Sequence, residues 1–339
     1  MRHVFIINPV AGKGKHLGAT RAAIAQASEK EGIVGEVYVT RAAGDGERYA
    51  REIVAAAGGE TVRLYACGGD GTLNEVLNGA YGAENAELAT VPVGSGNDFV
   101  KSFTEPEAFL DIPRQIAGKA EQLDVILCNG RCCMNLANIG FDSDVCRRMA
   151  DLKKLPLVSG KGAYNLAVAA TFVRKMGQRL RAIFPDGEVS DGVRILTAFG
   201  NGICYGGGYY ATPEASLTDG LIDISLIGKL SRGEIIRLIG EYKAGRHLHH
   251  PGFKPYLVFR RERSVRIESD RPIELCIDGE IRREGFSVDF KVGDARIPFI
   301  LPKGVRLLNN NVGGESAAAK TPTGGEAPAG RTPTAVAGL

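Results

Sequence analysis

Residues 62–79 (VRLYACGGDGTLNEVLNG) constrain the fold of this chain more than any other stretch. The first six of them, 62–67, are rich in apolar and β-forming residues, as in a buried parallel strand. The next four, 68–71, contain three glycines, which favour positive φ angles or the close approach of a ligand to bare backbone. Thr72 and Glu75 then have the spacing of a capping box at the start of a helix. The stretch therefore predicts a strand, a glycine turn and a helix.

The end of this turn has the features of a phosphate-binding site. A helix N-terminus presents free backbone N–H groups and the positive end of the helix dipole, and both attract phosphate. Asp70 lies in the turn, and its carboxylate would repel a phosphate unless a cation such as Mg²⁺ bridges the two, directly or through water. An ordinary tight strand–helix turn has similar glycine content, so this motif alone leaves both interpretations open.

Two further glycine-rich turns, 8–15 (NPVAGKGK) and 94–99 (GSGNDF), directly follow predicted strands. The first is not a Walker P-loop, which would need Gly at Pro9 and Ser or Thr at His16. Predicted helices alternate with the strands, which indicates a doubly wound parallel sheet. Ligands of such sheets lie beyond the carboxyl ends of the strands, where all three turns fall, and this coincidence favours a nucleotide site.

Beyond Pro113 the pattern changes to short strands separated by turns. Asn129-Gly130 has the sequence of a type I′ hairpin turn between arms at 123–128 and 131–141. After a helical stretch at 163–175, further strands are predicted at 193–199, 221–227, 256–259, 265–268, 273–277 and 286–291. Short strands of this kind predict an antiparallel β-sandwich, interrupted by one helix that starts with a capping box of Ser231 and Glu234.

The expected fold class is therefore α/β + β, with an N-terminal doubly wound α/β nucleotide-binding domain and a C-terminal antiparallel β-sandwich domain. The first domain is expected at residues 1–122 and the second, the substrate domain, at 123–296. Residues 297–308 hold a late strand that is expected to return to the first domain. Residues 309–339 are rich in Gly, Ala, Pro and Thr and lack aromatics, so they are expected to form a disordered tail.

Composition argues against several classes of protein. The net charge of +3, without an arginine-rich run, argues against nucleic acid as a partner. The seven cysteines contain no CxxC pair, and the cluster of Cys128, Cys132 and Cys133 has no second ligand pair for a metal. The sequence enters a strand at once and shows no apolar stretch of membrane-spanning length, so a cytoplasmic protein with reduced thiols is expected. His247, His249 and His250 are expected to lie solvated at a helix end.

In order along the chain, the motifs resemble those of the diacylglycerol kinase catalytic-domain family, the bacterial lipid kinases related to diacylglycerol and sphingosine kinases. The matching motifs are NPVAGKGK at 8–15, GGDGTLNEV at 68–76, PVGSGNDF at 92–99, NIGFDSDV at 138–145, GNGICYGGG at 200–208, ATPEASLTDGLID at 211–223 and IDGE at 277–280. The resemblance covers nearly the whole chain before the tail. One departure is Ser95-Gly96, where the family usually has Thr followed by a variable residue.

The resemblance implies an ATP-dependent lipid kinase with Mg²⁺, in which ATP lies between the domains. It assigns Glu280 as the base that accepts the proton of the lipid hydroxyl, and Asp278 as a residue that assists or competes in that role. Asp70 would organise Mg²⁺ near the phosphates, and Glu75 would face the nucleoside. The residues implied in ATP binding are Asn8, Pro9, Val10, Ala11, Gly12, Thr40, Gly68, Gly69, Asp70, Gly71, Thr72, Leu73, Asn74, Glu75 and Ser95. A second Mg²⁺ site is implied at Ser216, Asp219 and Leu221. From the residues alone, Asp278-Gly279-Glu280 and Thr218-Asp219-Gly220 also read as plain turns.

Two other functions remain open, an NAD kinase-like phosphotransferase and a nucleotide sensor without catalysis. The sequence does not name the acceptor lipid, and it leaves a homodimer open. A lipid hydroxyl lies at the membrane interface, so we expect peripheral association with the inner face of the membrane. Residues 151–158 (DLKKLPLV), which mix lysines and leucines just after Arg147 and Arg148, are the predicted contact with anionic lipid; an interdomain packing segment is the alternative.

Overall fold

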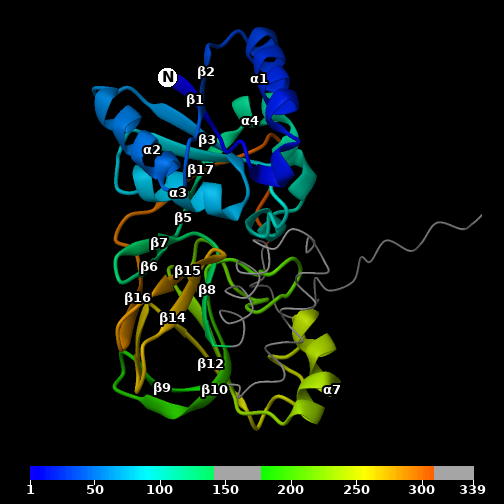
Figure 1. The fold of residues 1–339 in the computed structure, drawn as a ribbon, viewed down its shortest axis with the longest axis vertical. Helices are drawn as coiled ribbons and strands as arrows, with labels where there is room; N and C mark the ends of the chain where they lie inside the picture. Colours follow the sequence, from blue (N-terminus) through cyan, green and yellow to red (C-terminus); the bar gives the residue numbers. More distant parts are fainter. Residues whose placement is uncertain (141–176, 309–339) are drawn as a thin grey trace, which may run out of the picture.

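The computed structural model describes residues 1–140 and 177–308, which form an α/β domain and a β domain that follow one another along the long axis of the molecule (Figure 1). The strands of the first domain are β1 (Arg2–Ile7), β2 (Gly35–Val39), β3 (Val62–Gly68), β4 (Ala86–Pro92), β5 (Lys119–Leu123) and β17 (Ile297–Leu301). Its helices are α1 (Leu17–Glu31), α2 (Asp45–Ala56), α3 (Asp70–Ala80) and α4 (Ile112–Ile116), with short 3-10 helices at Ala11–Gly14, Phe99–Ser102 and Pro106–Leu110.

The sheet of the first domain has the strand order β2-β1-β3-β4-β17-β5. All of its neighbouring strands pair in parallel except β5, which is antiparallel to β17. Side chains of the central strand β3 alternate between two apolar cores: Leu64 packs on the side of α2 and α3, whereas Tyr65 packs on the side of α1 and α4. Helices therefore cover both faces, and the predicted doubly wound parallel sheet is confirmed.

Strand β17 comes from the far end of the described chain and lies between β4 and β5. Phe299, at its centre, packs on Phe99 and Phe103 with ring centroids 5.2 and 5.8 Å apart. The first domain is thus completed only after the second domain has been traversed.

The second domain contains β6 (Ile126–Cys128), β7 (Arg131–Cys133), β8 (Leu136–Gly140), β9 (Gln178–Ile183), β10 (Val189–Gly200), β11 (Ile222–Gly228), α7 (Arg232–Lys243), β12 (Leu257–Glu262), β13 (Ser264–Ser269), β14 (Glu274–Ile277), β15 (Glu280–Arg283) and β16 (Ser287–Val292). The long strand β10 joins two parts of its sheet. Its first half pairs with β9, and its second half pairs with β8 and β11. Side chains from both parts share one core, where Phe199 of β10 stacks on Phe290 of β16 with centroids 3.9 Å apart. The predicted antiparallel β domain is confirmed.

The hairpin at Asn129-Gly130 has the predicted turn but shorter arms. Both residues have positive φ, 46° and 84°, as a type I′ turn requires. The arms are β6 and β7, whereas β8, which was predicted to continue the second arm, pairs with β10 and β14 instead. The capping box at the start of α7 is present: Ser231 Oγ accepts the N–H of Glu234, and the Glu234 carboxylate accepts the N–H of Ser231.

Some predicted features lie outside the described residues: the helix at 163–175, the segment at 151–158 and the tail from 309. Among the described helices, none is both long and apolar enough to cross a membrane.

The prediction that His247 is solvated is wrong. His247 follows α7, but its side chain is fully buried between the rings of Tyr242 and Phe253, with centroids 4.7 and 5.8 Å away. His249 is exposed as predicted and pairs with the Glu214 carboxylate. Burial lowers the pKa of His247 from 6.5 to about 4, because a charged ring is disfavoured away from water.

We expect this histidine to make folding sensitive to acid. Its contribution to the free energy of unfolding is present above pH 6.5 and is lost as the pH falls toward about 4. Over that range the histidine binds a proton in the unfolded chain but stays neutral in the native state. His247→Phe should therefore remove about 3 kcal/mol of the pH dependence of the unfolding free energy over that range. Denaturant unfolding at several pH values measures the difference, and parallel pH profiles for both proteins would contradict it.

Candidate active site

The turns after β1, β3 and β4 meet because these three strands are adjacent in the sheet. Asn8, directly after β1, donates from Nδ2 to the Thr72 hydroxyl oxygen at 3.1 Å. Gly94, after β4, donates its N–H to the Gly68 carbonyl oxygen at 3.1 Å. A Cβ atom at Gly94 would lie only 2.4 Å from the Gly69 Cα, so this contact requires glycine. The fold thus brings the three glycine turns to one place.

Helix α3 begins within the second turn, at Asp70. The capping box predicted at Thr72 and Glu75 is therefore wrong, since Thr72 already lies inside the helix. The Glu75 carboxylate instead accepts the N–H groups of Gly44 and Gly46 at 2.8 and 3.0 Å. Those groups are at the start of α2, where the helix dipole favours negative charge. Glu75 thus fastens α2 to α3.

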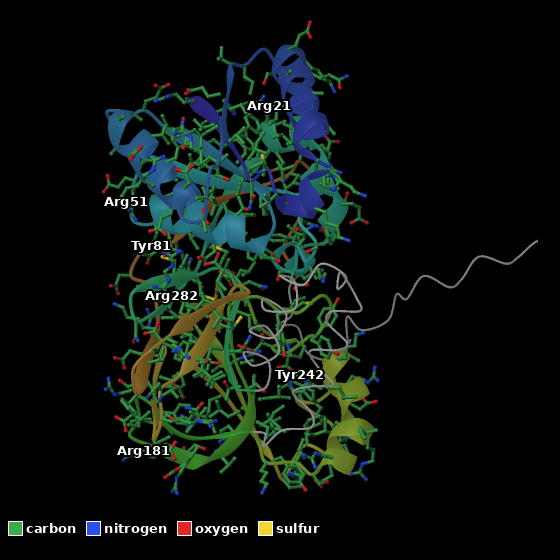
Figure 2. The ribbon with its side chains drawn as sticks, in the orientation of Figure 1. Arg21, Arg51, Tyr81, Arg181, Tyr242 and Arg282 are labelled. Carbon is green, nitrogen blue, oxygen red and sulfur yellow. The ribbon has the colours of Figure 1, made fainter. Side chains whose placement is uncertain are left out.

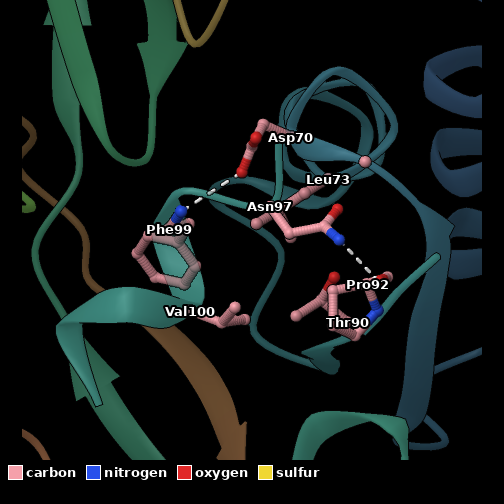
Figure 3. Close-up of a pocket in the computed structure, with 8 residues that line it drawn as sticks. Asp70, Leu73, Thr90, Pro92, Asn97, Phe99 and Val100 are labelled. Carbon is pink, nitrogen blue, oxygen red and sulfur yellow. Dashed lines mark hydrogen bonds between the residues drawn. The ribbon is translucent and has the colours of Figure 1, made fainter. Parts of the chain in front are cut away.

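Asp70 faces the third turn (Figure 3). Its carboxylate oxygens accept the N–H groups of Asp98 at 3.0 Å and Phe99 at 3.2 Å. A cavity of about 10 Å³, close to the size of one water molecule, lies beside it and is also lined by Leu73 and Asn97. Burial, reinforced by the charge of Asp98, raises the pKa of Asp70 to about 6, although the two N–H groups oppose that shift. A cation next to this carboxylate would be favourable.

Asp98 connects the third turn to the second domain. One carboxylate oxygen pairs with the Lys101 ammonium group, and the other accepts the N–H of Gly207 at 2.9 Å. Gly207 belongs to the connection between β10 and β11. The role of Asp98 was not predicted from the sequence, although Asp98 lies within the PVGSGNDF motif. An acidic residue directly after a glycine turn is the feature that could have indicated it.

Glu280 is the first residue of β15 and approaches the start of α3 from the second domain. A Cβ atom built on Gly71 would lie 3.2 Å from its Oε1 atom. Partial burial, followed by the charge of Glu75, raises the pKa of Glu280, and the Arg131 guanidinium opposes this. Among residues 1–140 and 177–308, no hydrogen bond to its carboxylate is found. This carboxylate is therefore the part of the site best placed to accept a proton.

Asp278, two residues earlier, has a different environment. It is buried, with φ +48°, and its carboxylate accepts five hydrogen bonds. The donors are the Asn74 side-chain amide at 2.8 Å, the Cys133 thiol at 3.3 Å and three backbone N–H groups: those of Met134 and Asn135, between β7 and β8, and that of Leu136, the first residue of β8. All of these groups donate, so the carboxylate is saturated. The geometry argues against Asp278 as a base and for a role in holding the turn that carries Glu280.

Asn74 and Arg131 complete the contact between the domains. Asn74, one turn into α3, also donates to the Cys132 carbonyl oxygen at 2.8 Å. Arg131 of β7 pairs with Glu47 of α2 and donates to the Asn74 side-chain oxygen at 3.3 Å. Arg131 was not foreseen, because only the folded chain brings β7 against α2 and α3.

The other residues implied in ATP binding surround the same edge of the sheet. Pro9, Val10, Ala11 and Gly12 form the first turn, where the Val10 N–H donates to Asn8 Oδ1 at 3.1 Å and the Val10 side chain is 76% exposed. Thr40 is buried at the end of β2 and donates its N–H to the Ile7 carbonyl oxygen at 2.9 Å. Ser95 is exposed in the third turn.

The loop implied as a second Mg²⁺ site, residues 216–221, lies at the junction of the domains. Asp219 Oδ1 accepts the N–H of Leu221 at 3.0 Å, and in the described chain no partner is found for its other oxygen. The loop is anchored by buried Asp124, which accepts the N–H of Gly220 at 2.7 Å and pairs with Arg296. No group of three or more His, Cys, Asp or Glu side chains with metal-binding geometry occurs among the described residues. One free carboxylate oxygen plus backbone carbonyls could still complete the shell of a largely hydrated Mg²⁺.

Two protein families match the chain, one for each domain. Residues 2–128 match the diacylglycerol kinase catalytic domain, and residues 135–292 match the YegS C-terminal NAD kinase beta sandwich-like domain. Among solved structures, a diacylglycerol kinase from Bacillus anthracis superposes with a TM-score of 0.65 at 20% identity, over 88% of this chain and 96% of that one. At that identity the likeness supports the fold.

Sequence relatives extend the match across both domains. A probable lipid kinase YegS-like protein of Pseudomonas aeruginosa is 32% identical over 87% of this chain and 94% of its own length. A diacylglycerol kinase of Bacillus subtilis is 29% identical over 81% of this chain and 88% of its own length. The chain therefore belongs to the family of lipid kinases with a diacylglycerol kinase catalytic domain.

Proposed function

We propose that this kinase transfers the γ-phosphate of ATP to the hydroxyl group of a diacylglycerol-like lipid at the inner face of the membrane. The observation that carries the proposal is the position of Glu280. Its carboxylate has no hydrogen-bond partner among the described residues; it comes from the second domain and faces the start of α3, within reach of the glycine turns of the first. Phosphoryl transfer depends mainly on positioning and charge neutralisation, which a base, a cation and backbone donors can supply.

In this proposal each part of the site has one task. The backbone N–H groups of Gly68 to Gly71 and the start of α3 hold the phosphates of ATP, and Asn8 keeps the first turn against them. Glu280 accepts the proton of the attacking hydroxyl group, and Asp278 holds the turn that carries Glu280. Mg²⁺, when bound, would neutralise phosphate charge, and Asp70 would orient it. The buried carboxylate of Asp70, whose pKa is raised to about 6, fits that demand for a cation.

The test is an acceptor screen with the purified protein, Mg²⁺ and radiolabelled ATP. Acceptors are diacylglycerol, a sphingoid base, a prenol and phosphatidylglycerol, each in vesicles, and NAD⁺ in solution. We expect a phosphorylated product from the diacylglycerol-like acceptor, identified by mass spectrometry. NADP formation would favour the NAD kinase-like alternative, and ATP binding without transfer to any acceptor would favour the nucleotide sensor.

Asp70→Asn should weaken the binding of ATP in the presence of Mg²⁺ by about tenfold or more, the usual value of a hydrogen bond or contact to a charged group. Binding measured without a divalent cation should change little, because the backbone donors remain. Calorimetric titration with and without Mg²⁺ separates the two, and Asp111→Asn, an exposed acid of the same domain, is the control. Equal loss under both conditions would show that Asp70 acts only by holding the third turn.

The same variant isolates the second proposed Mg²⁺ site. Asp70→Asn leaves the loop at 216–221 intact, so the melting temperature of this variant should still rise with Mg²⁺ concentration. If the melting temperature does not depend on Mg²⁺, metal binding by Ser216, Asp219 and Leu221 is excluded. The loop would then be a turn closed by Asp219.

A further inference from the structure

Helix α7 has an outer face that combines exposed isoleucines with cations. Ile236 is 69% exposed and Ile239 is 38% exposed, although both are large apolar side chains. The exposed residues that share this side of the helix are Arg232, Gly233, Ile236, Arg237, Ile239, Gly240 and Lys243, and we call them the α7 outer face. Three of these seven residues are basic and none is acidic.

The opposite side of α7 explains why this face points outward. Leu238 and Tyr242 are buried in an apolar core with Phe253. The acidic residues of the helix are held away from the outer face. Glu234 accepts hydrogen bonds from Ser231 and Tyr256, and Glu241 pairs with Arg246. The outer face itself therefore contains basic residues and no acidic one.

Helix α7 also contacts the loop that reaches the candidate active site. The Tyr242 and Tyr205 hydroxyl groups lie 3.3 Å apart. Lys243 is exposed at the edge of the outer face, and its ammonium group lies 5.5 Å from the centre of the Tyr209 ring. Gly207, which lies between Tyr205 and Tyr209 in the sequence, donates its N–H to the Asp98 carboxylate. The backbone N–H of Asp98 in turn donates to Asp70. Figure 2 shows Tyr242 on the side of α7 that faces the rest of the molecule. Helix α7 and the loop between β10 and β11 therefore connect the outer face to the candidate active site.

We propose that the α7 outer face docks on an anionic lipid bilayer; this rests on the proposed function, in which the substrate is a membrane lipid. Helices that lie in a membrane interface have this pattern, with apolar side chains that enter the acyl boundary and cations that contact anionic headgroups. A protein partner fits less well, because stable protein interfaces bury roughly 1,000 Å² or more, and this face offers only two isoleucines as an apolar centre.

The experiment is flotation with vesicles of phosphatidylcholine, with or without phosphatidylglycerol, and it needs no catalysis. Wild type should bind only the anionic vesicles. The double variant Arg237→Glu, Lys243→Glu should lower the bound fraction by about tenfold or more, since each basic residue near an anionic surface contributes to the free energy of membrane binding. Ile236→Ser with Ile239→Ser should also lower it, with unchanged net charge. Arg21→Glu with Lys30→Glu, on exposed positions of α1, makes the same change in net charge and should have little effect.

Melting temperatures verify that all variants are folded. Undiminished binding of both α7 variants, or equal loss in the α1 control, would overturn the proposal. So would a change from dimer to monomer in the isoleucine variant without loss of vesicle binding, because the occupant would then be a second copy of the chain. Failure of the proposed function looks different: wild type and the α1 control would bind vesicles through α7 but phosphorylate no lipid, including a short-chain, water-soluble diacylglycerol.

Discussion

Glu280→Gln is expected to slow phosphoryl transfer by about 10²–10⁴-fold, the usual contribution of a positioned base, while ATP binding stays nearly unchanged. Glutamine preserves the size of the side chain but cannot accept the proton of the hydroxyl group. The carboxylate makes no hydrogen bond to the described residues, so its loss should not alter the melting temperature. Single-turnover transfer to diacylglycerol, together with calorimetric ATP binding, measures both effects.

The pH profile gives a second readout of the same variant. Burial and the nearby Glu75 raise the pKa of Glu280, so this carboxylate is protonated at a higher pH than an ordinary glutamate. Activity of wild type should fall as the pH drops through that raised pKa, and Glu280→Gln should lack this acidic limb. Glu284→Gln, on an acid that follows β15 and already accepts a hydrogen bond from Asn129, is the matched control. Wild-type turnover in Glu280→Gln would exclude it as the base.

Asp278→Asn is expected to act mainly on stability. All five groups around the carboxylate are donors. The asparagine amide would keep one acceptor oxygen, but its NH₂ group is a donor and could not accept hydrogen bonds from the others. Buried donors left without acceptors cost about 1–3 kcal/mol each, so a total of about 3 kcal/mol or more is expected. The melting temperature should fall by roughly 6–12 °C at about 2–4 °C per kcal/mol. Turnover should fall as well, because the turn that carries Glu280 loses its anchor to Asn74.

The two variants together assign the roles of the two acids. Differential scanning calorimetry and turnover are measured on both, and Asn74→Ala serves as a control that removes one donor from the other side of the contact. A positioning residue should lose stability and activity together. If Asp278→Asn keeps the wild-type melting temperature but loses transfer, then Asp278 touches the substrate, and Glu280 is the residue whose role must be reassigned.

Several features of the fold could be predicted because they depend on residues near one another in the sequence. The alternation of strands with helices determines a parallel sheet, and glycine turns after its strands determine where a ligand can approach the backbone. The Asn129-Gly130 turn and the capping box of Ser231 and Glu234 were predictable for the same reason. Glu280, by contrast, became a candidate only through resemblance to a family, since Asp-Gly-Glu alone is typical of a turn.

The tertiary structure decided which polar groups are occupied. Asp278 and Glu280 are two residues apart and chemically alike, yet one is saturated by donors from α3 and from the bend between β7 and β8, and the other is left without a partner in the described chain. Glu75 has the spacing of a capping residue but binds the start of α2, and His247 follows a helix end but is buried between aromatic rings. The physical reason is common to these cases: burial and hydrogen bonding depend on chain segments far away in sequence, and local patterns do not specify their approach. The sequence by itself determined the alternation of strands and helices in the first domain and the edge of the sheet where the turns lie. Only packing between distant segments decided which carboxylate there lacks a hydrogen-bond partner in the described chain.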